Sequence, residues 1–428
     1  MDIISKKRHA ITLRHLTALF MCCVMALPTQ ARSSARELFE DTRTLVYQIR
    51  VIDLGSGDKF SIGSGFAVAG DGRIATNFHV VSSYVHEPEK YRLEAVAHDN
   101  SVAALELLAI DVVHDLAIVT ISQELPRYLS LAPRELSKGD RIYSMGNPLD
   151  LGMTIIEGTY NGLVENSRYR NILFSGSLNA GMSGGPALNA DGEVMGINVA
   201  KGAEQISFLV PVRHLVPLVK KSATAGPRDD YSADIAEVLL ADQQAFYEQV
   251  LANMDSRKRL GDLEVVDKLQ DSLRCWGHSL DKEDIRFEAA HQHCKSEDQT
   301  FIANELTTGD FGYDFEFIYT EELNRFQFYN LLEERYTHRD LHNATDMEQV
   351  TPFTCQDDRL TLRSGDWKIS SCLRRYRDYE GLYDASMVMV SQDHPDKAAV
   401  VQVSAAGISR GNALALLQGF AEAVSWKL

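Results

Sequence analysis

The sequence predicts a mainly β first half followed by an α+β second half. In the first half, short apolar runs rich in β-branched residues are separated by glycine and aspartate turns, which is typical of an antiparallel sandwich or barrel. A stretch of small and polar residues, 222–231, then interrupts the pattern as a linker would. Beyond it, helix-like and strand-like runs occur without an internal repeat, which favours a separate α+β domain over 232–428.

Length and charge narrow the class of protein. The chain has 428 residues, enough for two or three domains, and a formal net charge of −17. An acidic surface disfavours nucleic acids and anionic membranes as partners, because both are bound by clustered lysine and arginine. We therefore expect no nucleic-acid partner.

Residues 1–31 have the order of a secretory signal peptide. Basic residues at 6–8 and 14 precede an apolar run over 16–27, and Ala31 is a small residue at the cleavage position. An uncleaved membrane anchor is the alternative, but the run falls short of the ~20 residues that a membrane-spanning helix needs. We expect cleavage after Ala31, an exported mature chain and no stable membrane insertion after cleavage.

The cysteines of the mature chain all lie in its second half. They are Cys275, Cys294, Cys355 and Cys372. An even number in an exported chain favours disulfides, and we favour the pairs that are close in sequence, Cys275–Cys294 and Cys355–Cys372. The alternative is a metal site, because His278, His291 and His293 stand near the first pair. Their spacing fits no zinc pattern that we can name, and we expect no metal or cofactor.

Local patterns predict the elements of the first half. Residues 34–42 are expected to form a short helix capped by Ser34, and residues 211–221 a closing helix. Period and β-branching predict strands between these helices. The expected strands include 44–52, 63–68, 74–81, 116–119, 154–156, 159–164, 172–174 and 194–199.

Ser183 stands in a glycine-rich turn over 181–186 with the sequence Gly-Met-Ser-Gly-Gly-Pro. Glycine permits backbone conformations closed to other residues, so such a turn can direct successive N–H groups into one small hole beside the hydroxyl. A hole of this kind would stabilise a tetrahedral oxyanion during acyl transfer. Taken alone the motif is weak, because a plain tight turn has the same composition.

His79 and Asp115 lie upstream of this turn. His79 ends the strand-like run 74–81, where a lone histidine is usually a satisfied core or surface residue, and Asp115 precedes an apolar strand as an ordinary turn residue would. Together with Ser183, however, they supply what a serine nucleophile needs. An imidazole can take the hydroxyl proton, and a carboxylate can orient the ring.

The order of these motifs resembles that of the trypsin-like serine proteases, and most closely the HtrA (Do-like) branch. The resemblance covers about residues 40–215. The segments that carry it are Gly63–Phe66, Thr76–Val81, Asp115–Val119, Gly146–Pro148, Gly181–Pro186 and Gly192–Asn198.

This resemblance implies a chymotrypsin-like fold of two six-stranded β-barrels over 34–221, with the active site between them. It implies that His79 is the general base, that Asp115 is the orienting acid, and that Ser183 is the nucleophile. The oxyanion-hole N–H groups would come from Gly181 and Ser183. The resemblance also implies protein or peptide substrates and a periplasmic location.

The sequence departs from the pattern of that branch in two places. Met182 occupies a position where relatives commonly have asparagine, and no PDZ-like pattern follows the linker. The oligomeric state is therefore left open. A third position, Ser177, lies six residues before the nucleophile and is not acidic, so we expect a small or apolar residue before the scissile bond.

In the second half we expect helices over 232–254, 263–273 and 410–424. The expected strands are 285–293, 300–306, 315–319, 325–336, 367–373, 385–390 and 398–403. The pattern holds no catalytic constellation. We therefore expect an accessory domain that binds substrate, gates the cleft or recruits a partner.

The sequence thus predicts an exported serine endopeptidase that hydrolyses proteins through an acyl-enzyme intermediate. Two alternatives stay open. In one, the protease fold has become a catalytically silent scaffold with a binding or chaperone-like role. In the other, the C-terminal domain holds the protease inactive.

Overall fold

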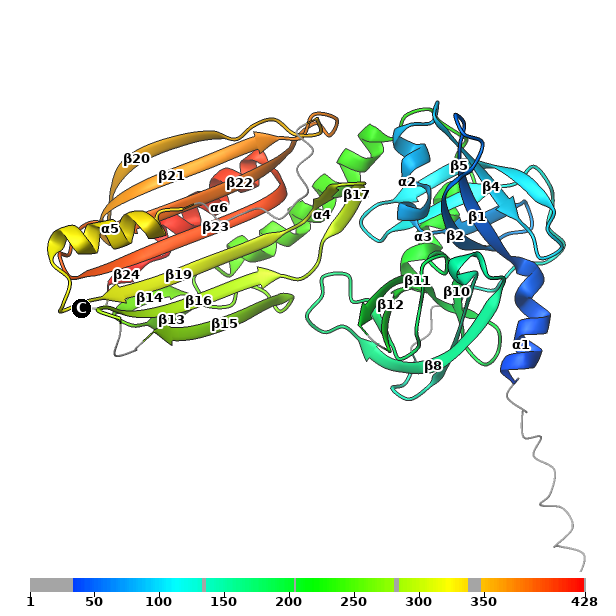
Figure 1. Ribbon diagram of the computed structural model, residues 1–428, viewed down its shortest axis with the longest axis horizontal. Coiled ribbons are helices and arrows are strands. Elements are labelled where there is room, and N and C mark those ends of the chain that lie inside the picture. Colours follow the sequence, from blue (N-terminus) through cyan, green and yellow to red (C-terminus); the bar gives the residue numbers. More distant parts are fainter. Residues whose placement is uncertain (1–33, 133–135, 204, 281–284, 338–347, 427–428) are drawn as a thin grey trace, which may run out of the picture.

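The computed structural model describes residues 34–132, 136–203, 205–280, 285–337 and 348–426. The expected signal peptide and its cleavage site lie outside the described residues. The described chain is mainly β, as predicted, and has two lobes (Figure 1). Two β-barrels form one lobe, and a large sheet with its helices forms the other.

Two closed barrels of six strands each make up the first half of the chain, as the resemblance implied. The first has the strand order β1-β2-β3-β6-β5-β4 and the second β10-β11-β12-β9-β8-β7. The first barrel contains β1 (Val46–Asp53), β2 (Lys59–Ala67), β3 (Arg73–Thr76), β4 (Tyr91–Val96), β5 (Val102–Asp111) and β6 (Leu116–Thr120). The second contains β7 (Arg141–Gly146), β8 (Thr154–Leu163), β9 (Ile172–Phe174), β10 (Pro186–Leu188), β11 (Val194–Ala203) and β12 (Ile206–Pro211).

An apolar core joins the two barrels. Phe66 and Ile118 of the first barrel pack in one buried cluster with Tyr143 and Ile197 of the second. Burial of this kind is worth roughly 25 cal/mol per Å² of apolar surface, so the shared cluster fixes the barrels against each other. The cleft between them is therefore built on a rigid base.

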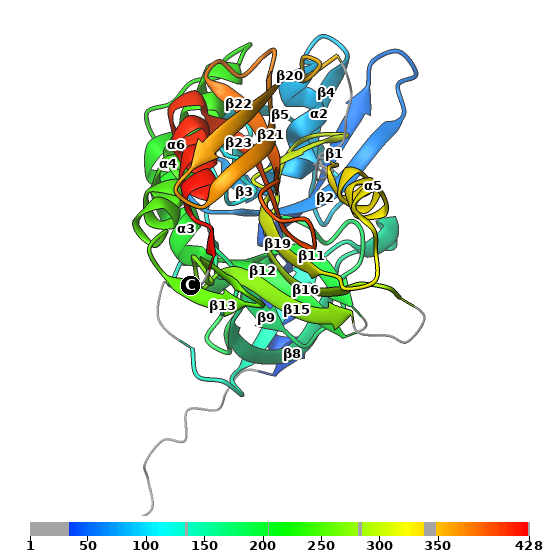
Figure 2. The same cartoon turned by 90° about the vertical axis from the view of Figure 1, so that its left-hand side faces the viewer.

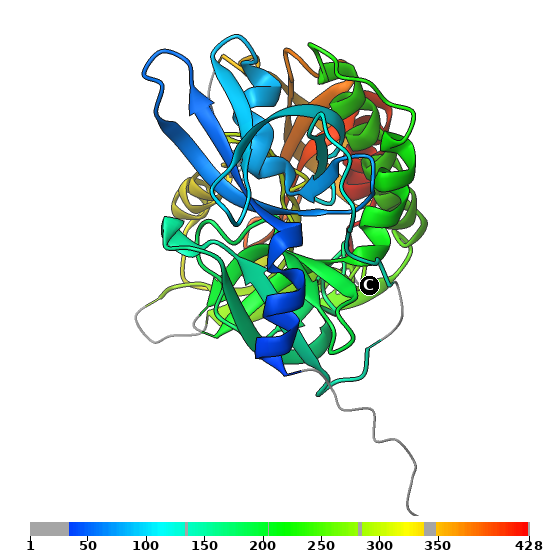
Figure 3. The same ribbon diagram turned by 90° about the vertical axis from the view of Figure 1, so that its right-hand side faces the viewer.

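Two helices predicted from the sequence are confirmed at this core. Helix α1 (Ala35–Thr42) lies on the outer side of the barrels, away from the second lobe (Figure 3), and leads through the 3₁₀ turn η1 (Arg43–Leu45) into β1. Ser34 caps it in a reciprocal capping box with Glu37. Helix α3 (Val212–Ser222) follows the last strand of the second barrel, and its buried Leu215 and Leu218 pack in the core that the two barrels share.

The strand predicted over 74–81 is wrong in its second half. Strand β3 ends at Thr76, and helix α2 (Phe78–His86) begins two residues later. Buried Phe78, Val81 and Val85 recur at the helical spacing, so packing against the first barrel overrides the β preference of the valines. His79 therefore lies in the first turn of a helix and not at the end of a strand.

A seven-stranded antiparallel sheet dominates residues 232–426, which we call the C-terminal module. Helices α4 (Ser232–Ala252) and α6 (Arg410–Glu422) cover one face, and α5 (Arg325–Arg335) lies against the other (Figure 2). In sheet order the strands are β15 (Leu273–Leu280), β16 (Glu288–Ser296), β19 (Phe311–Tyr319), β23 (Lys397–Ser409), β22 (Leu382–Ser391), β21 (Gly365–Arg375) and β20 (Thr354–Leu362).

Two small sheets complete the module. One contains β13 (Arg257–Leu260), β14 (Leu263–Val266) and β24 (Ser425–Trp426). The other is a hairpin of β17 (Thr300–Ala303) and β18 (Leu306–Thr308), which reaches toward α2 and the first barrel (Figure 1). We call it the β17–β18 hairpin.

Both predicted disulfides are confirmed. Cys275 lies opposite Cys294 on β15 and β16, and Cys355 lies opposite Cys372 on β20 and β21. The alternative metal site loses both of its cysteine ligands, because their sulfurs are bonded to each other. Among the described residues, no group of histidine, cysteine and acidic side chains could hold a metal ion.

Three predicted elements of the module are wrong, and one of them, the single strand expected over 300–306, is instead the β17–β18 hairpin. The helix expected over 263–273 is strand β14 and a turn, since Leu263 and Val265 alternate into the core. The strand expected over 325–336 is helix α5, where Asn324 and Gln327 form a capping box. The aromatic residues of this segment favoured a strand, and the capping signal should have taken precedence.

Helix α4 belongs to both lobes. Its first half, with Ile235 and Leu239, belongs to a buried apolar cluster that joins residues of the first barrel to residues of the C-terminal module, and its second half, with Phe246 and Val250, packs under the seven-stranded sheet. Among the helices of the described residues, none is both long enough and apolar enough to cross a membrane.

Candidate active site

His79 and Asp115 are brought into direct contact. The Nδ1 atom of His79 lies 2.6 Å from Oδ2 of Asp115, and the backbone N–H of His79 donates to Oδ1 over 2.8 Å. An ionised carboxylate can only accept, so the ring proton sits on Nδ1 and Nε2 is left able to take a proton. Asp115 therefore sets both the tautomer and the orientation of the imidazole.

The backbone at Asp115 is held in an uncommon conformation. Its φ is 54°, in the left-handed region that aspartate tolerates better than most residues. The side chain of Asn77, which precedes α2, donates to the Asp115 carbonyl over 2.7 Å. The carboxylate thereby faces the N-terminal turn of α2, where the helix dipole favours a negative charge.

This environment raises the pKa of His79. Burial lowers the pKa of the imidazole, but the charge of Asp115 and its hydrogen bond outweigh the effect of burial, and the pKa lies above its ordinary value. The pair thus stabilises the imidazolium that forms when the ring accepts a proton.

The raised pKa predicts the acid limb of the activity profile. Catalysis needs a neutral imidazole, so activity should rise as the pH increases through the pKa of His79, with the midpoint above the ordinary value of 6.5. The measurement is kcat/KM for a peptide substrate between about pH 5 and pH 9. A midpoint at or below 6.5 would contradict this reading of the His79–Asp115 pair.

The first barrel holds the Ser183 turn through Ser64 of β2. The backbone N–H of Ser64 donates to the Ser183 carbonyl and its hydroxyl donates to the Gly181 carbonyl, each over 2.7 Å. From the second barrel, the Asn198 side chain donates to the Met182 carbonyl over 3.1 Å. Sequence reasoning placed Ser64 and Asn198 in matching motifs but did not identify them as the residues that fix the turn.

The turn can present two free N–H groups. Within the described part of the chain, the backbone N–H groups of Gly181 and Ser183 have no hydrogen-bond acceptor, whereas those of Met182, Gly184 and Gly185 are all paired. Two unpaired donors flanking one hydroxyl are the arrangement that an oxyanion hole requires.

Glycine is required at two positions of this turn. Gly184 has a φ of 83°, and a Cβ atom there would lie 2.2 Å from the Ser64 carbonyl oxygen. Gly181 has a φ of 91°, and its Cβ would lie 2.4 Å from the Asn147 carbonyl oxygen. Any side chain at either position would displace the backbone that forms the hole.

Ser183 lies beside α2 but is not hydrogen-bonded to His79. Gly63 approaches both Val80 of α2 and the Ser183 carbonyl, which places the turn next to the helix that carries His79. Among the hydrogen bonds of the described residues, the Ser183 hydroxyl donates to the Val199 carbonyl over 3.3 Å and none joins it to His79. Catalytic hydrogen bonds are often loose before substrate binds, so the lack of this bond does not argue against a Ser183–His79 pair.

Residues 63–197 match the family model of the trypsin-like peptidase domain. The first half of this chain resembles the trypsin-like serine proteases. Serine protease HTRA1 of Xenopus laevis is 35% identical over 159 residues, which cover 35% of this chain and 33% of the frog protein. Mitochondrial serine protease HTRA2 of Bos taurus is 30% identical over 201 residues, covering 43% of each chain. This chain thus spans less than half the length of these relatives.

Among solved structures, the serine endoprotease from Yersinia pestis covers 44% of this chain and 66% of its own, at 25% identity and a TM-score of 0.39. That score is too low to support an argument about the whole chain. The family model ends at residue 197, so the C-terminal module lies beyond the matched domain.

The departure at Met182 has a structural basis in the trypsin-like domain. The Met182 side chain is fully buried and packs in a cluster of the second barrel with Ile142, Phe174 and Leu209. It anchors the turn in this apolar cluster, while the N–H groups of Gly181 and Ser183 on either side have no acceptor among the described residues. Ser177 lies on the surface.

The C-terminal module reaches the cleft of the trypsin-like domain through contacts that no sequence motif indicated. Phe301 of the β17–β18 hairpin meets the His79 ring edge-on, with 6.3 Å between ring centroids. The His86 ring at the end of α2 contacts the Ile302 carbonyl through Nε2 over 2.8 Å. The hairpin therefore touches the same helix that positions the base.

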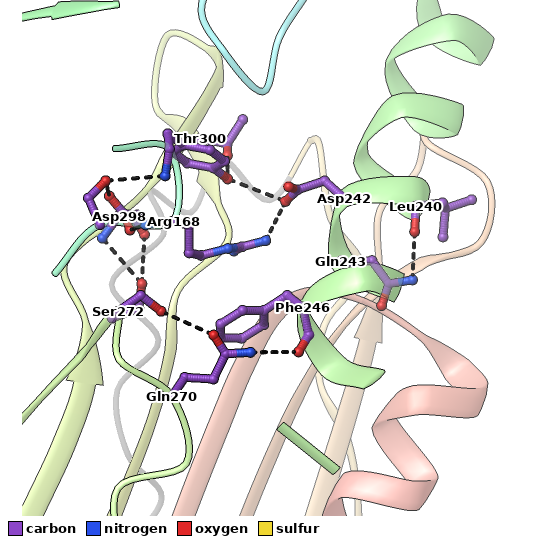
Figure 4. Close-up of polar contacts among 12 residues, drawn as sticks. Arg168, Leu240, Asp242, Gln243, Phe246, Gln270, Ser272, Asp298 and Thr300 are labelled. Atoms are coloured by element: carbon purple, nitrogen blue, oxygen red, sulfur yellow. Dashed lines mark hydrogen bonds and ion pairs between the residues drawn. The ribbon is translucent and has the colours of Figure 1, made fainter. Parts of the chain in front are cut away.

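A polar clamp around Arg168 fastens the module to the second barrel (Figure 4). Arg168 lies in the loop between β8 and β9, and its guanidinium pairs with Asp242 of α4 and stacks over the ring of Phe246 at 4.2 Å. Its backbone N–H donates to Asp298 over 2.6 Å, and the neighbouring Tyr169 hydroxyl contacts Thr300 over 3.1 Å. The guanidinium side chain is only 9% exposed.

Removing this clamp should loosen the contact between the lobes. Arg168→Ala leaves the carboxylate of Asp242 without its partner, so we expect the free energy of unfolding to fall by about 3 kcal/mol. Urea unfolding would measure the change. The matched control is Arg141→Ala in the same barrel, where Arg141 and its partner Glu157 are 64% and 44% exposed, and the expected loss is under about 0.5 kcal/mol. Equal losses of unfolding free energy in the two variants would show that the Arg168 clamp does not stabilise the contact between the lobes.

Proposed function

We propose that this chain is an exported serine endopeptidase that acts on polypeptides. The observation that carries the proposal is the combination of the His79–Asp115 contact at 2.6 Å with a Ser183 turn that has two unpaired N–H groups. The similarity of residues 63–197 to the trypsin-like peptidase domain supports the same reaction.

The chemistry follows from the positions of these groups. His79 takes the proton of the Ser183 hydroxyl as the hydroxyl attacks the scissile carbonyl, and the N–H groups of Gly181 and Ser183 stabilise the oxyanion. His79 then donates its proton to the departing amine, which leaves an acyl group on Ser183. Water, activated by the same imidazole, releases the acyl group and restores the hydroxyl.

The test combines a covalent probe with a protein substrate. The chain from Arg32 onward would be incubated with a fluorophosphonate, which labels activated serines, and separately with casein. We expect labelling on Ser183 and cleavage of casein. A folded chain that does neither would refute the endopeptidase and favour the silent scaffold, whereas labelling without cleavage would indicate a working triad behind a closed cleft.

The second candidate is a protease restrained by its own C-terminal module. Two observations favour it. The Ser183 hydroxyl donates a hydrogen bond to the Val199 carbonyl, and the β17–β18 hairpin packs against the helix that carries His79. A chain ending near Lys221 is a poor test, because it removes Ile235 and Leu239 of α4 from an apolar cluster that they share with the first barrel. The full-length Arg168→Ala variant is suitable, and restraint predicts faster casein cleavage than in the wild type. An equal or lower rate would exclude it.

Export is part of the proposal. The basic residues, apolar run and small residue at 31 support removal of residues 1–31 and release into the periplasm. Expression of the whole chain in a Gram-negative bacterium, followed by fractionation and N-terminal sequencing, is the measurement. The expected result is a periplasmic chain that begins at Arg32, and an uncleaved membrane-bound chain would refute it.

A further inference from the structure

A cavity of about 720 Å³ opens beside the catalytic pair, within the roughly 300–1,000 Å³ typical of ligand pockets. His79 and Asp115 lie at one end of it. Both barrels contribute walls, the second through the loop between β8 and β9. The remaining wall comes from residues 297–304 of the C-terminal module, including Phe301 and Asn304.

The lining is mostly apolar between charged ends. Val113 and Val210 are buried in it, and Val164, Val199 and Phe208 are half-buried. At the rim, the exposed side chains of Arg274 and Glu297 carry opposite charges. Asp298 also lines the cavity, but its carboxylate accepts hydrogen bonds from Ser167 and from the Arg168 backbone. The pocket therefore suits an uncharged, apolar side chain.

Phe301 is held in this wall by its own contacts to α2 and by the contacts of the residues on either side of it. Its ring meets the rings of His79 and Phe78 edge-on, each with 6.3 Å between centroids. The residues on either side of it are anchored, Thr300 to Tyr169 of the second barrel and Ile302 to His86 of α2. A ring fixed in this way is a preorganised surface and not a flexible flap.

We propose that the β17–β18 hairpin is a wall of the substrate cleft and that Phe301 selects polypeptides with a bulky apolar side chain beside the scissile bond. The occupant is the substrate itself, because the cavity is continuous with the catalytic pair. This inference rests on the proposed endopeptidase function. It assigns substrate selection to the C-terminal module, in addition to the protease fold.

The test separates binding from cleavage. A library of blocked peptides, each with one variable position, is captured on the full-length Ser183→Ala chain, which cannot turn peptides over, and bound peptides are identified by mass spectrometry. We expect leucine, phenylalanine or methionine to be enriched at least about tenfold over glycine or aspartate at one position. In Ser183→Ala/Phe301→Ala the enrichment should fall below about threefold.

Two further variants complete the design. Phe326→Ala in the same background is the matched control, because Phe326 belongs to the same module but is 83% exposed on α5, and it should keep the full enrichment. Phe301→Trp provides a second test in case the alanine variant folds poorly. The larger ring should narrow the pocket and shift the preference toward small residues. Equal enrichment in all variants, or none in any, would overturn the inference.

Wild-type cleavage of the captured peptides distinguishes the two proposals. If enrichment depends on Phe301 but the wild type does not cleave the captured peptides, the cavity is a peptide-binding pocket and the proposed endopeptidase function is refuted. Cleavage with a preference that ignores Phe301 would leave the endopeptidase standing and refute the selective wall.

Discussion

Ser183→Ala is expected to lower kcat for casein hydrolysis by about 10⁶-fold and to abolish fluorophosphonate labelling. Without the hydroxyl no acyl-enzyme can form, and His79 has no proton to take from residue 183. A residual acceleration of about 10³–10⁴-fold over water should persist, because the N–H groups of Gly181 and residue 183 belong to the backbone and survive the substitution.

The measurement is steady-state release of casein peptides, with a matched serine as control. Ser101 is exposed, and its hydroxyl makes only a local hydrogen bond to Asp99, so Ser101→Ala should retain labelling and activity. Casein cleavage that is unchanged in Ser183→Ala would place the nucleophile elsewhere and contradict the assignment.

Asp115→Asn should reduce kcat by about 10⁴-fold without unfolding the chain. An amide has nearly the same shape as the carboxylate, but it allows the ring proton to move to Nε2, where the imidazole can no longer act as a base. The substitution also removes the charge that raises the pKa of His79. The acid limb of the remaining activity should therefore shift to lower pH.

A second acid–histidine pair four residues away provides the control. Asp111 contacts Nδ1 of His114 over 2.8 Å, in the same local geometry but outside the triad. Asp111→Asn should keep kcat within about tenfold of the wild type, and its acid limb should not move. If the two variants lost activity equally, Asp115 would have no special role in catalysis.

The residues proposed to be catalytic could be selected from the sequence because they sit in local motifs with a fixed order. His79, Asp115 and Ser183 each look ordinary alone, and their order along the chain made them a set. The disulfides were also predicted from local spacing, since Cys275 and Cys294 are close in sequence and pair across neighbouring strands. Local spacing was sufficient for the disulfides, and for the proposed triad the structure shows the contact between His79 and Asp115.

What the sequence could not indicate depends on contacts between distant segments. The helix at Phe78–His86 was taken for a strand because its valines have β preference, and only packing on the first barrel decides otherwise. Phe301 stands more than two hundred residues from His79 in the chain, and nothing local to either residue indicates that their rings meet. The Arg168 clamp likewise exists only once both lobes are assembled.

Helix α4 makes the stability of the two lobes a shared property. Ile235 and Leu239 lie in the apolar cluster that joins the first barrel to the module, while Phe246 and Val250 lie in the core under the large sheet. Unfolding of either cluster would remove the packing partners of one half of α4. The two lobes should therefore unfold as one cooperative unit. A lesion anywhere in the C-terminal module then weakens the protease barrels as well, and a cut in the segment between α3 and α4 would not free the module from them.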